Sequence, residues 1–196
     1  MNVELLTSCS SFHDMEYFAA LAALTCHANT DREFVAHDVL GRIIKAGHES
    51  ILEHMNLTYS VKGITRAVLQ ELARHRHISL SVESTRHTLR KELSKDVFDA
   101  RCENHYRTEL VRWLTDIAYD NPDMPNDELK YYLPEFWPTN LILTSNIREL
   151  RHIFDLRTAP AALKEFRDLC HAMYEAVPEQ FRYLLKDCVH EEASHD

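Results

Sequence analysis

Three short segments of the chain have the hydrophobic pattern of strands. They are residues 3–7, 57–61 and 140–144. In the second, Leu57, Tyr59 and Val61 alternate with two hydroxyl side chains, the period of two expected for a strand with one buried face. We expect these segments to pair in a small antiparallel or mixed sheet.

Longer segments carry apolar side chains three or four residues apart, the spacing of helices. They are residues 14–27, 31–46, 65–73, 95–119, 146–156 and 161–186, the last interrupted near Pro178. We expect Asp14 to cap the first helix and Gly47 to end the second. Residues 75–90 have no clean period and predict an ordered loop. The whole pattern predicts one α+β domain over residues 1–196, a small sheet with a helical bundle, and a frayed tail from about residue 190.

Composition and length agree with a globular protein of one domain. The chain has 196 residues, of which 45% are hydrophobic and 27% charged, unlike a disordered chain. Only three residues are glycine, where average usage of about 7% would give about 14. Neither a P-loop nor a G-x-G-x-x-G motif can be written with so few, so side chains must do much of what glycine loops do for a bound nucleotide.

The N-terminus and the cysteines indicate a cytoplasmic protein with no membrane partner. The first residues have no basic leader, and no apolar run approaches the ~18–20 residues that span a membrane. The cysteines are odd in number, widely spaced and without C-x-x-C, which is typical of reduced thiols. They are Cys9, Cys26, Cys102, Cys170 and Cys188.

Positive charge is concentrated between Lys62 and Lys91, which we call the cationic segment. The chain has a net charge of −9, but this segment has seven cations against Glu71 and Glu83, a net charge of +5. Arg74–His77 are four consecutive basic residues whose mutual repulsion an anion would relieve. Hydroxyl groups that suit phosphate oxygens follow at Ser79, Ser81, Ser84, Thr85 and Thr88. We expect an anion site here; a solvated basic loop is the alternative.

The cationic segment also contains a motif with fixed internal spacing. Arg74-His75-Arg76-His77-Ile78-Ser79, followed by Ser84-Thr85-Arg86, resembles the R-H-R-x-x-S…S-x-R signature of the flavin-dependent thymidylate synthases. The resemblance extends to residues 47–54, 63–67, 133–134, 146–148 and 156–157. It therefore covers most of the chain.

This resemblance implies a definite activity and assembly. Enzymes of the family are homotetramers that bind FAD at subunit junctions. They reduce FAD with NADPH and methylate deoxyuridine monophosphate at C5, using a carbon from methylenetetrahydrofolate, to form thymidine monophosphate. The resemblance thus implies small-molecule substrates and no nucleic acid polymer as partner.

The resemblance also implies roles for individual residues. For FAD these are Ser50, Arg74, His75, Arg76, Asn146, Arg148 and His152. For the nucleotide they are Glu71, Arg74, Glu83, Ser84, Thr85, Arg86, Lys130 and Arg157. Arg157 is also the implied catalytic residue, since it would face the uracil and favour its ionised N3. The chain departs from the family at Lys130, usually arginine, at Val82, commonly polar, and at His87, usually aromatic.

The residue types also fit this chemistry. Methylating C5 of uracil requires that carbon to become nucleophilic. One route is addition of a thiolate to the pyrimidine, but none of the five cysteines lies in the cationic segment. The other route is electrostatic: cations polarise the carbonyl groups, and a flavin supplies electrons. Many arginines without a placed thiol favour the second route, so we expect no protein nucleophile.

Two functions of other classes remain open from the residues alone. His37-Asp38 is similar to the dyad of helical HD-type metal-dependent phosphohydrolases, although a dyad would not explain the arginines. A non-enzymatic RNA-binding module would present aromatic side chains among its basic ones, and residues 62–91 contain no Phe, Tyr or Trp. His48 and His54 lie six residues apart, on different faces of a helix, so we expect no metal site.

Overall fold

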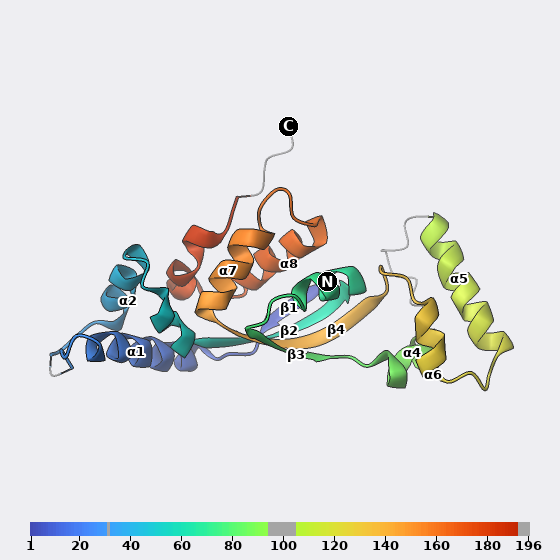
Figure 1. The fold of residues 1–196 in the computed structure, drawn as a ribbon, viewed down its shortest axis with the longest axis horizontal. Coiled ribbons are helices and arrows are strands. Elements are labelled where there is room, and N and C mark those ends of the chain that lie inside the picture. The colour runs from blue at the N-terminus through green and yellow to red at the C-terminus, as the bar shows by residue number, and fades with distance from the viewer. Residues whose placement is uncertain (31, 94–104, 192–196) are drawn as a thin grey trace.

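A four-stranded antiparallel sheet lies at the centre of the described part of the molecule (Figure 1). The computed structural model describes residues 1–30, 32–93 and 105–191. The strands are β1 (Asn2–Leu5), β2 (Asn56–Thr65), β3 (Ile78–Val82) and β4 (Pro138–Asn146), in the spatial order β1-β2-β4-β3. β2 and β4 pair from Asn56 opposite Asn146 to Thr65 opposite Pro138. The small antiparallel sheet is confirmed, with longer central strands than the sequence pattern predicted.

Two helices and a short 3₁₀ helix form one end of the molecule, the α1–α2 end. They are α1 (Cys9–Thr25), α2 (Ala36–Lys45) and η1 (Glu49–His54). The prediction that Asp14 caps the first helix is wrong. Ser8 is the N-cap, and its Oγ accepts a hydrogen bond from the backbone N–H of Ser11 at 3.3 Å. The preceding polar residues concealed the first turn, because they carry no apolar periodicity.

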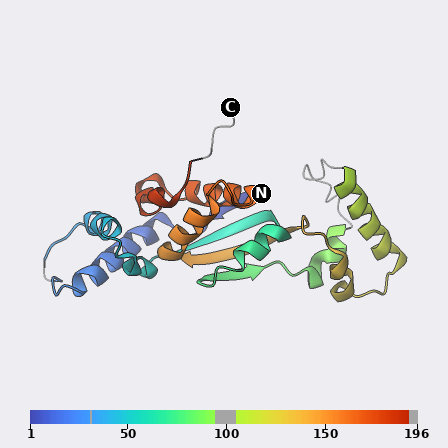
Figure 2. The same cartoon turned by 45° about the horizontal axis from the view of Figure 1, so that its top comes forward.

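A second, smaller hydrophobic core lies at the opposite end, in what we call the α4–α5 lobe (Figures 1 and 2). Its elements are α4 (Thr85–Leu93), α5 (His105–Asp120), α6 (Asn126–Leu129) and η3 (Lys130–Tyr132). Its buried residues are Leu89, Val111, Leu114, Ala118, Leu129 and Trp137. The Arg90 guanidinium of α4 donates to the carbonyl oxygens of Ala118, Asn121 and Met124, at 2.7, 2.7 and 2.6 Å. One cation thus ties the end of α5 to α4.

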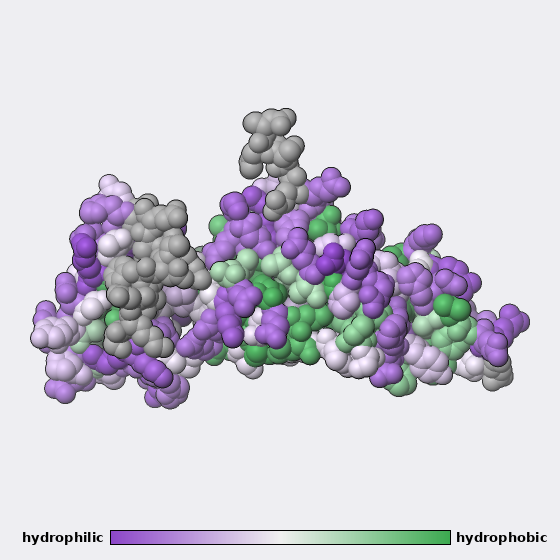
Figure 3. Space-filling model, turned by 180° about the vertical axis from the view of Figure 1, so that it is seen from behind, coloured by the Kyte–Doolittle hydropathy of each residue, from purple (hydrophilic) through white to green (hydrophobic). Residues whose placement is uncertain are grey.

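Large apolar side chains are exposed at both ends. Figure 3 shows hydrophobic surface on the middle of the rear face and again towards the α1–α2 end. The exposed residues of the α1–α2 end include Tyr17, Phe18 and Val35. Those of the α4–α5 lobe include Tyr106, Leu110, Trp113, Tyr119, Tyr131 and Tyr132. Such a surface is more typical of a protein that contacts a partner than of a monomer.

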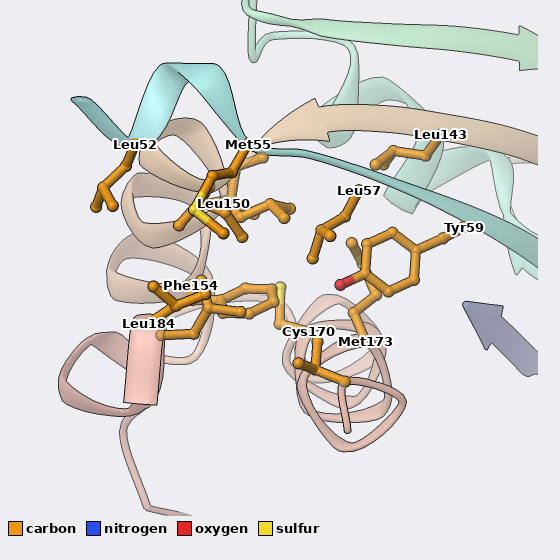
Figure 4. Packing of buried hydrophobic residues seen from close by; sticks show 14 of the residues in the cluster. Leu52, Met55, Leu57, Tyr59, Leu143, Leu150, Phe154, Cys170, Met173 and Leu184 are labelled. Atoms are coloured by element: carbon orange, nitrogen blue, oxygen red, sulfur yellow. The ribbon is translucent and has the colours of Figure 1, made fainter. Parts of the chain in front are cut away.

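The main core lies on one face of the sheet, under α7 (Ile147–Arg157) and α8 (Lys164–Glu175). Figure 4 shows Leu57, Tyr59 and Leu143 of the sheet facing Leu150 and Phe154 of α7 and Cys170 and Met173 of α8. Fully burying one such aliphatic or aromatic side chain contributes about 1.5–3 kcal/mol. This core therefore fixes α7, which carries several predicted site residues, over the sheet.

Two segments differ from the sequence prediction. Residues 75–90 are not a loop: they include β3, whose backbone pairs with residues 141–145 of β4, and the start of α4. The last long helix is also wrong in extent. α8 ends at Glu175, and up to residue 191, where the described chain stops, only the 3₁₀ helices η4 (Glu179–Leu184) and η5 (Lys186–Cys188) follow. Pro178 lacks an N–H and disfavours helix in the residue before it, which explains the stop.

The remaining helix, α3 (Arg66–Leu72), follows β2 without a loop. Its N-cap is Thr65, whose Oγ1 accepts from the Val68 N–H at 3.4 Å. Glu165 of α8 accepts hydrogen bonds from the Thr65 N–H and hydroxyl at 2.9 and 2.7 Å. α3 is thereby fixed against α8. No helix in the described ranges is long and apolar enough to cross a membrane.

Replacing Arg90 tests the tie between α4 and α5. Arg90→Met keeps the apolar stem but removes the donors to three carbonyl oxygens, so we expect a loss of about 2 kcal/mol in the free energy of unfolding. Hydrogen exchange in α5 should accelerate. The matched control is Arg112→Met, because the pair that Arg112 makes with Glu109 is exposed and should contribute less than about 0.5 kcal/mol. Equal denaturation midpoints for the two variants would contradict this role of Arg90.

Candidate active site

Arg157, at the end of α7, is held by the residues around the end of α3. Its Nη1 donates to Glu71 Oε2 at 2.7 Å, and its Nε donates to His75 Nε2 at 3.2 Å. The guanidinium also lies over the ring of Phe166 in α8, 5.0 Å from the centroid. Glu71 is shared with Arg74, at 3.7 Å, so two arginines meet one carboxylate and the group keeps a net positive charge.

His75 is the buried member of this group, with only 7% of its surface exposed. Its Nδ1 lies 3.4 Å from Glu149 Oε1, and its ring is edge-on to His152, with 5.9 Å between centroids. Burial and the Arg157 charge lower the pKa of His75, although Glu149 acts in the opposite direction. The ring is therefore neutral at pH 7.

A cavity of about 600 Å³ opens beside α7. It is lined by Glu49, Glu53, His77, Asn146, Arg148, Glu149, Arg151, His152, Asp155 and Cys188. Asn146 is also the N-cap of α7, since its Oδ1 accepts from the Glu149 N–H at 2.8 Å. Arg148 pairs with Glu53 at 2.5 Å, and both side chains are half exposed. Arginine, amide and imidazole groups thus line one open space together with carboxylates.

Three residues of the predicted FAD set, Asn146, Arg148 and His152, are brought together in this cavity. The others are not among its lining residues. Ser50 is exposed on η1. Arg74 and Arg76, which flank His75 in the sequence, are also exposed. His75 itself is buried and contacts Arg157. One cavity thus contains three of the seven residues, and the FAD role of all seven stays a prediction.

Arg151, a buried residue of α7, stabilises the side of the cavity that includes Cys188. Its Nε donates to Glu49 at 2.9 Å, and its two Nη atoms donate to the Asp187 carboxylate at 2.6 and 2.7 Å. Nη1 also donates to the Leu184 carbonyl at 2.7 Å. These bonds join η1, α7 and the segment that carries Cys188. Of the tail predicted to fray, residues 192–196 lie outside the described residues.

The other predicted nucleotide residues lie at the far end of β3. They are Glu83, Ser84, Thr85, Arg86 and Lys130, which we call the second nucleotide group. Asn140 donates to Glu83, while Arg86 and Lys130 share Asp127, at 2.9 and 3.4 Å. The five residues of β3, at about 3.4 Å each, separate this group from Arg74–His77 by roughly 17 Å.

The described cysteines Cys9, Cys26, Cys170 and Cys188 are free. Burial raises the pKa of Cys170 strongly, and burial also raises the pKa of Cys188 to about 11 despite the neighbouring Arg151. Both are therefore thiols at neutral pH and weak nucleophiles. The sequence did not place Cys188 at the cavity. Cys102 lies outside the described residues.

Comparison with known proteins identifies the family. The model of the family described as thymidylate synthase complementing protein matches residues 6–181. The flavin-dependent thymidylate synthase of Campylobacter jejuni (strain RM1221) is 37% identical over 180 residues, which cover 85% of each chain. That of Helicobacter pylori (strain J99) is 35% identical over 176 residues, covering 81% of this chain and 83% of that protein.

A solved structure agrees with this result. The crystal structure of thymidylate synthase X from Helicobacter pylori with FAD and dUMP has a TM-score of 0.82 and 28% identity, covering 97% of this chain and 100% of that one. The chain belongs to the family of flavin-dependent thymidylate synthases, so the resemblance read from the sequence is confirmed. These matches do not favour the metal-dependent phosphohydrolase or the RNA-binding module.

Sequence reasoning missed two carboxylates and an aromatic ring that contact the predicted site residues. Glu149 and Glu53 lie far in sequence from His75 and Arg148, which they contact, and Phe166 stands on α8, the helix after the one that carries Arg157. Glu149 did carry a local signal: it stands three residues after Asn146, the spacing of a capping box. That signal predicts a helix start rather than a contact with His75.

The pair between Arg151 and Asp187 should make stability depend on pH. The Arg151 hydrogen bonds lower the pKa of Asp187, so the carboxylate stabilises the fold above its unfolded pKa of about 3.9 and loses this effect as the pH falls through its lower folded pKa. Asp187→Asn should lower the free energy of unfolding by about 1–2 kcal/mol at pH 7. The difference from the unsubstituted protein should shrink towards pH 3 in urea titrations.

A surface carboxylate serves as the control. Asp168 pairs with the exposed Lys164 one turn away, and Asp168→Asn should change the free energy of unfolding by less than about 0.5 kcal/mol at either pH. A penalty for Asp187→Asn that is the same at pH 7 and pH 3 would show that the carboxylate charge does not act through Arg151.

Proposed function

We propose that this chain forms thymidine monophosphate from deoxyuridine monophosphate, with FAD as cofactor, NADPH as reductant and methylenetetrahydrofolate as the carbon donor. The observation that carries the proposal is Arg157, an arginine oriented by Glu71 and by His75, whose neighbours Glu149 and His152 line a polar cavity. The family supports the same reaction.

The cavity residues suit FAD by their chemistry. Arg148 provides a cation for a phosphate, and Asn146 and His152 provide groups that accept or donate hydrogen bonds to a flavin or ribose. Ser50 and the Arg74–Arg76 motif complete the proposed set. When bound, FAD supplies the electrons that reduce the transferred carbon to a methyl group.

Arg157 is proposed to act on the uracil ring. Within residues 1–30, 32–93 and 105–191, its Nη2 donates to no partner, and its side chain is 19% exposed. A fixed cation at N3 stabilises the negative charge that the ring carries when it loses that proton. Charge on the ring makes C5 nucleophilic without a cysteine, in agreement with the raised thiol pKa values.

We also propose that the chain acts as a homotetramer with active sites at subunit junctions. Arg157 contacts His75 before β3, and the second nucleotide group follows β3, so the roughly 17 Å length of the strand separates them along the chain, which supports a site completed by a neighbouring subunit. The exposed aromatic residues of α1 and α5 provide surface for subunit contacts. The cytoplasmic location stays a prediction from the unpaired cysteines.

The function is tested with the purified protein and its four reactants. Added FAD should give a bound flavin spectrum and a higher melting temperature, and the complete mixture should form thymidine monophosphate, measured by mass spectrometry. Arg157→Ala should keep FAD but lose about 10²–10³-fold in turnover, the usual effect of one donor that stabilises a developing anion. Arg112→Ala on α5 is the control. No response to FAD, or full activity of Arg157→Ala, would refute the assignment.

Lys130 provides a separate test of the second nucleotide group. Its Nζ lies near Asp127, which also holds Arg86, so both proposed phosphate contacts are already oriented. A charge-assisted phosphate contact contributes roughly 1.5–3 kcal/mol, so Lys130→Ala should weaken binding of the monophosphate about tenfold to a hundredfold. The loss should shrink at high salt, and FAD binding should not change.

Three comparisons make the Lys130 test decisive. Lys130→Arg should retain binding, and Lys164→Ala, which removes an exposed lysine paired with Asp168, should have no effect. Deoxyuridine should bind the Lys130→Ala variant as it binds the unsubstituted protein. If nucleoside and monophosphate are weakened equally, or neither is weakened, Lys130 does not hold the phosphate.

A further inference from the structure

The ring of His75 lies between a hydrogen-bond donor, Arg157, and an acceptor, Glu149. On one side, Arg157 Nε donates to His75 Nε2 at 3.2 Å. On the other, Glu149 Oε1 lies 3.4 Å from Nδ1. Both ring nitrogens are therefore engaged inside the chain. The side chain has no nitrogen left for FAD, so any hydrogen bond from His75 to the cofactor must come from its backbone.

Hydrogen-bond chemistry fixes the protonation of this ring. A guanidinium has only donors, so Nε2 must present its lone pair to Arg157. In a neutral imidazole the proton then sits on Nδ1, where a carboxylate is the partner that accepts it. A proton on Nε2, in the other tautomer or in the imidazolium, would set two N–H groups against each other.

We propose that His75 is a positioning residue that aims Arg157 at the uracil, and that Glu149 keeps His75 in the tautomer this requires. The proposal rests on the role of Arg157 proposed above. His75 fixes Nε, Glu71 fixes Nη1 and Phe166 supports the guanidinium plane, which leaves Nη2 for the substrate. Glu149 stands in the first turn of α7 and Arg157 in the last. His75, which precedes β3, contacts both of them and so connects the two ends of the helix.

The charges around the ring define its response to pH. Glu149, His152 and Arg157 of α7 face it, with Phe166 of α8 against its edge and Glu71 of α3 beyond Arg157. Arg157 and burial lower the pKa of His75, and Glu149 raises it. Protonation of His75 at acid pH removes the acceptor for Arg157, so deoxyuridylate-dependent turnover should fall on the acid side. Glu149→Gln should move that fall to lower pH.

A tautomer measurement tests the geometry independently of catalysis. In protein labelled with ¹⁵N-histidine, long-range ¹H–¹⁵N spectra distinguish the two neutral tautomers and the imidazolium, and His75→Gln identifies the resonance. We expect a protonated Nδ1 and a bare Nε2 at pH 7. An imidazolium, or a proton on Nε2, would overturn the proposal even if the enzyme is fully active.

Two amide substitutions separate positioning from packing. The longer side chain in His75→Gln can place its oxygen near the position of Nε2 and still accept from Arg157, whereas His75→Asn reaches only as far as Nδ1. With FAD bound equally, His75→Gln should keep kcat/KM for deoxyuridine monophosphate within about tenfold, and His75→Asn should lose about a hundredfold. The control His13→Asn removes an exposed histidine that pairs with Glu16 and should change nothing.

The outcomes distinguish this inference from the proposed function. If the unsubstituted protein forms no thymidine monophosphate, the function fails, while the tautomer still decides the geometry. If thymidine monophosphate forms and His75→Asn equals His75→Gln, the function stands and the positioning role is refuted. If turnover of the Glu149→Gln variant falls at the same acid pH as that of the unsubstituted protein, Glu149 does not control the protonation of His75.

Discussion

The pairing of β2 with β4 fixes where the residues of the candidate site stand. β2 leads into α3 and β4 leads into α7, and the two strands run in opposite directions. The helices therefore leave the sheet at opposite ends, and α7 must run back over the core. Its eleven residues, about 16 Å long, bring Arg157 at its end to Glu71 in α3. The register of one strand pair thus sets an interaction between residues 86 positions apart.

Charge compensation is the second constraint. The chain is acidic overall, yet several arginines lie around the site, and Arg148, Arg151 and Arg157 each have a carboxylate beside them. Arg151 is the extreme case, because it is buried and holds both Glu49 and Asp187. Losing one partner of a buried cation costs more than the pair contributes, because the remaining charge stays out of water. Such networks keep arginine side chains in one orientation before any substrate arrives.

The sequence predicted the elements whose signals are local. α7 was predicted to within about one residue, because Asn146 is a strong N-cap and the apolar spacing after it is regular. β3 was missed although its residues do alternate, with Ile78, Leu80 and Val82 apolar and Ser79 and Ser81 polar. The alternation covers only five residues between the basic motif and the start of α4, and it has no regular period when residues 75–90 are taken as one segment.

The same limit applies to the site. The arginine and histidine motif could be read from the chain, because its residues are adjacent and its spacing is specific. The partners Glu149, Asp127 and Asp187 could not, since they reach His75, Arg86 and Arg151 across 36 or more positions. Residue types predict which charges a site will have; the fold decides which of them meet.

The strand β3 leaves little room for insertions or deletions. Ile78 and Leu80 point towards the core and Ser79 and Ser81 away from it. Removing one residue would turn these faces over, because side chains alternate along a strand. It would also move Arg86 and its neighbours by about 3.4 Å relative to His75. We therefore expect relatives to differ in length in other surface segments and to keep the same number of residues in β3.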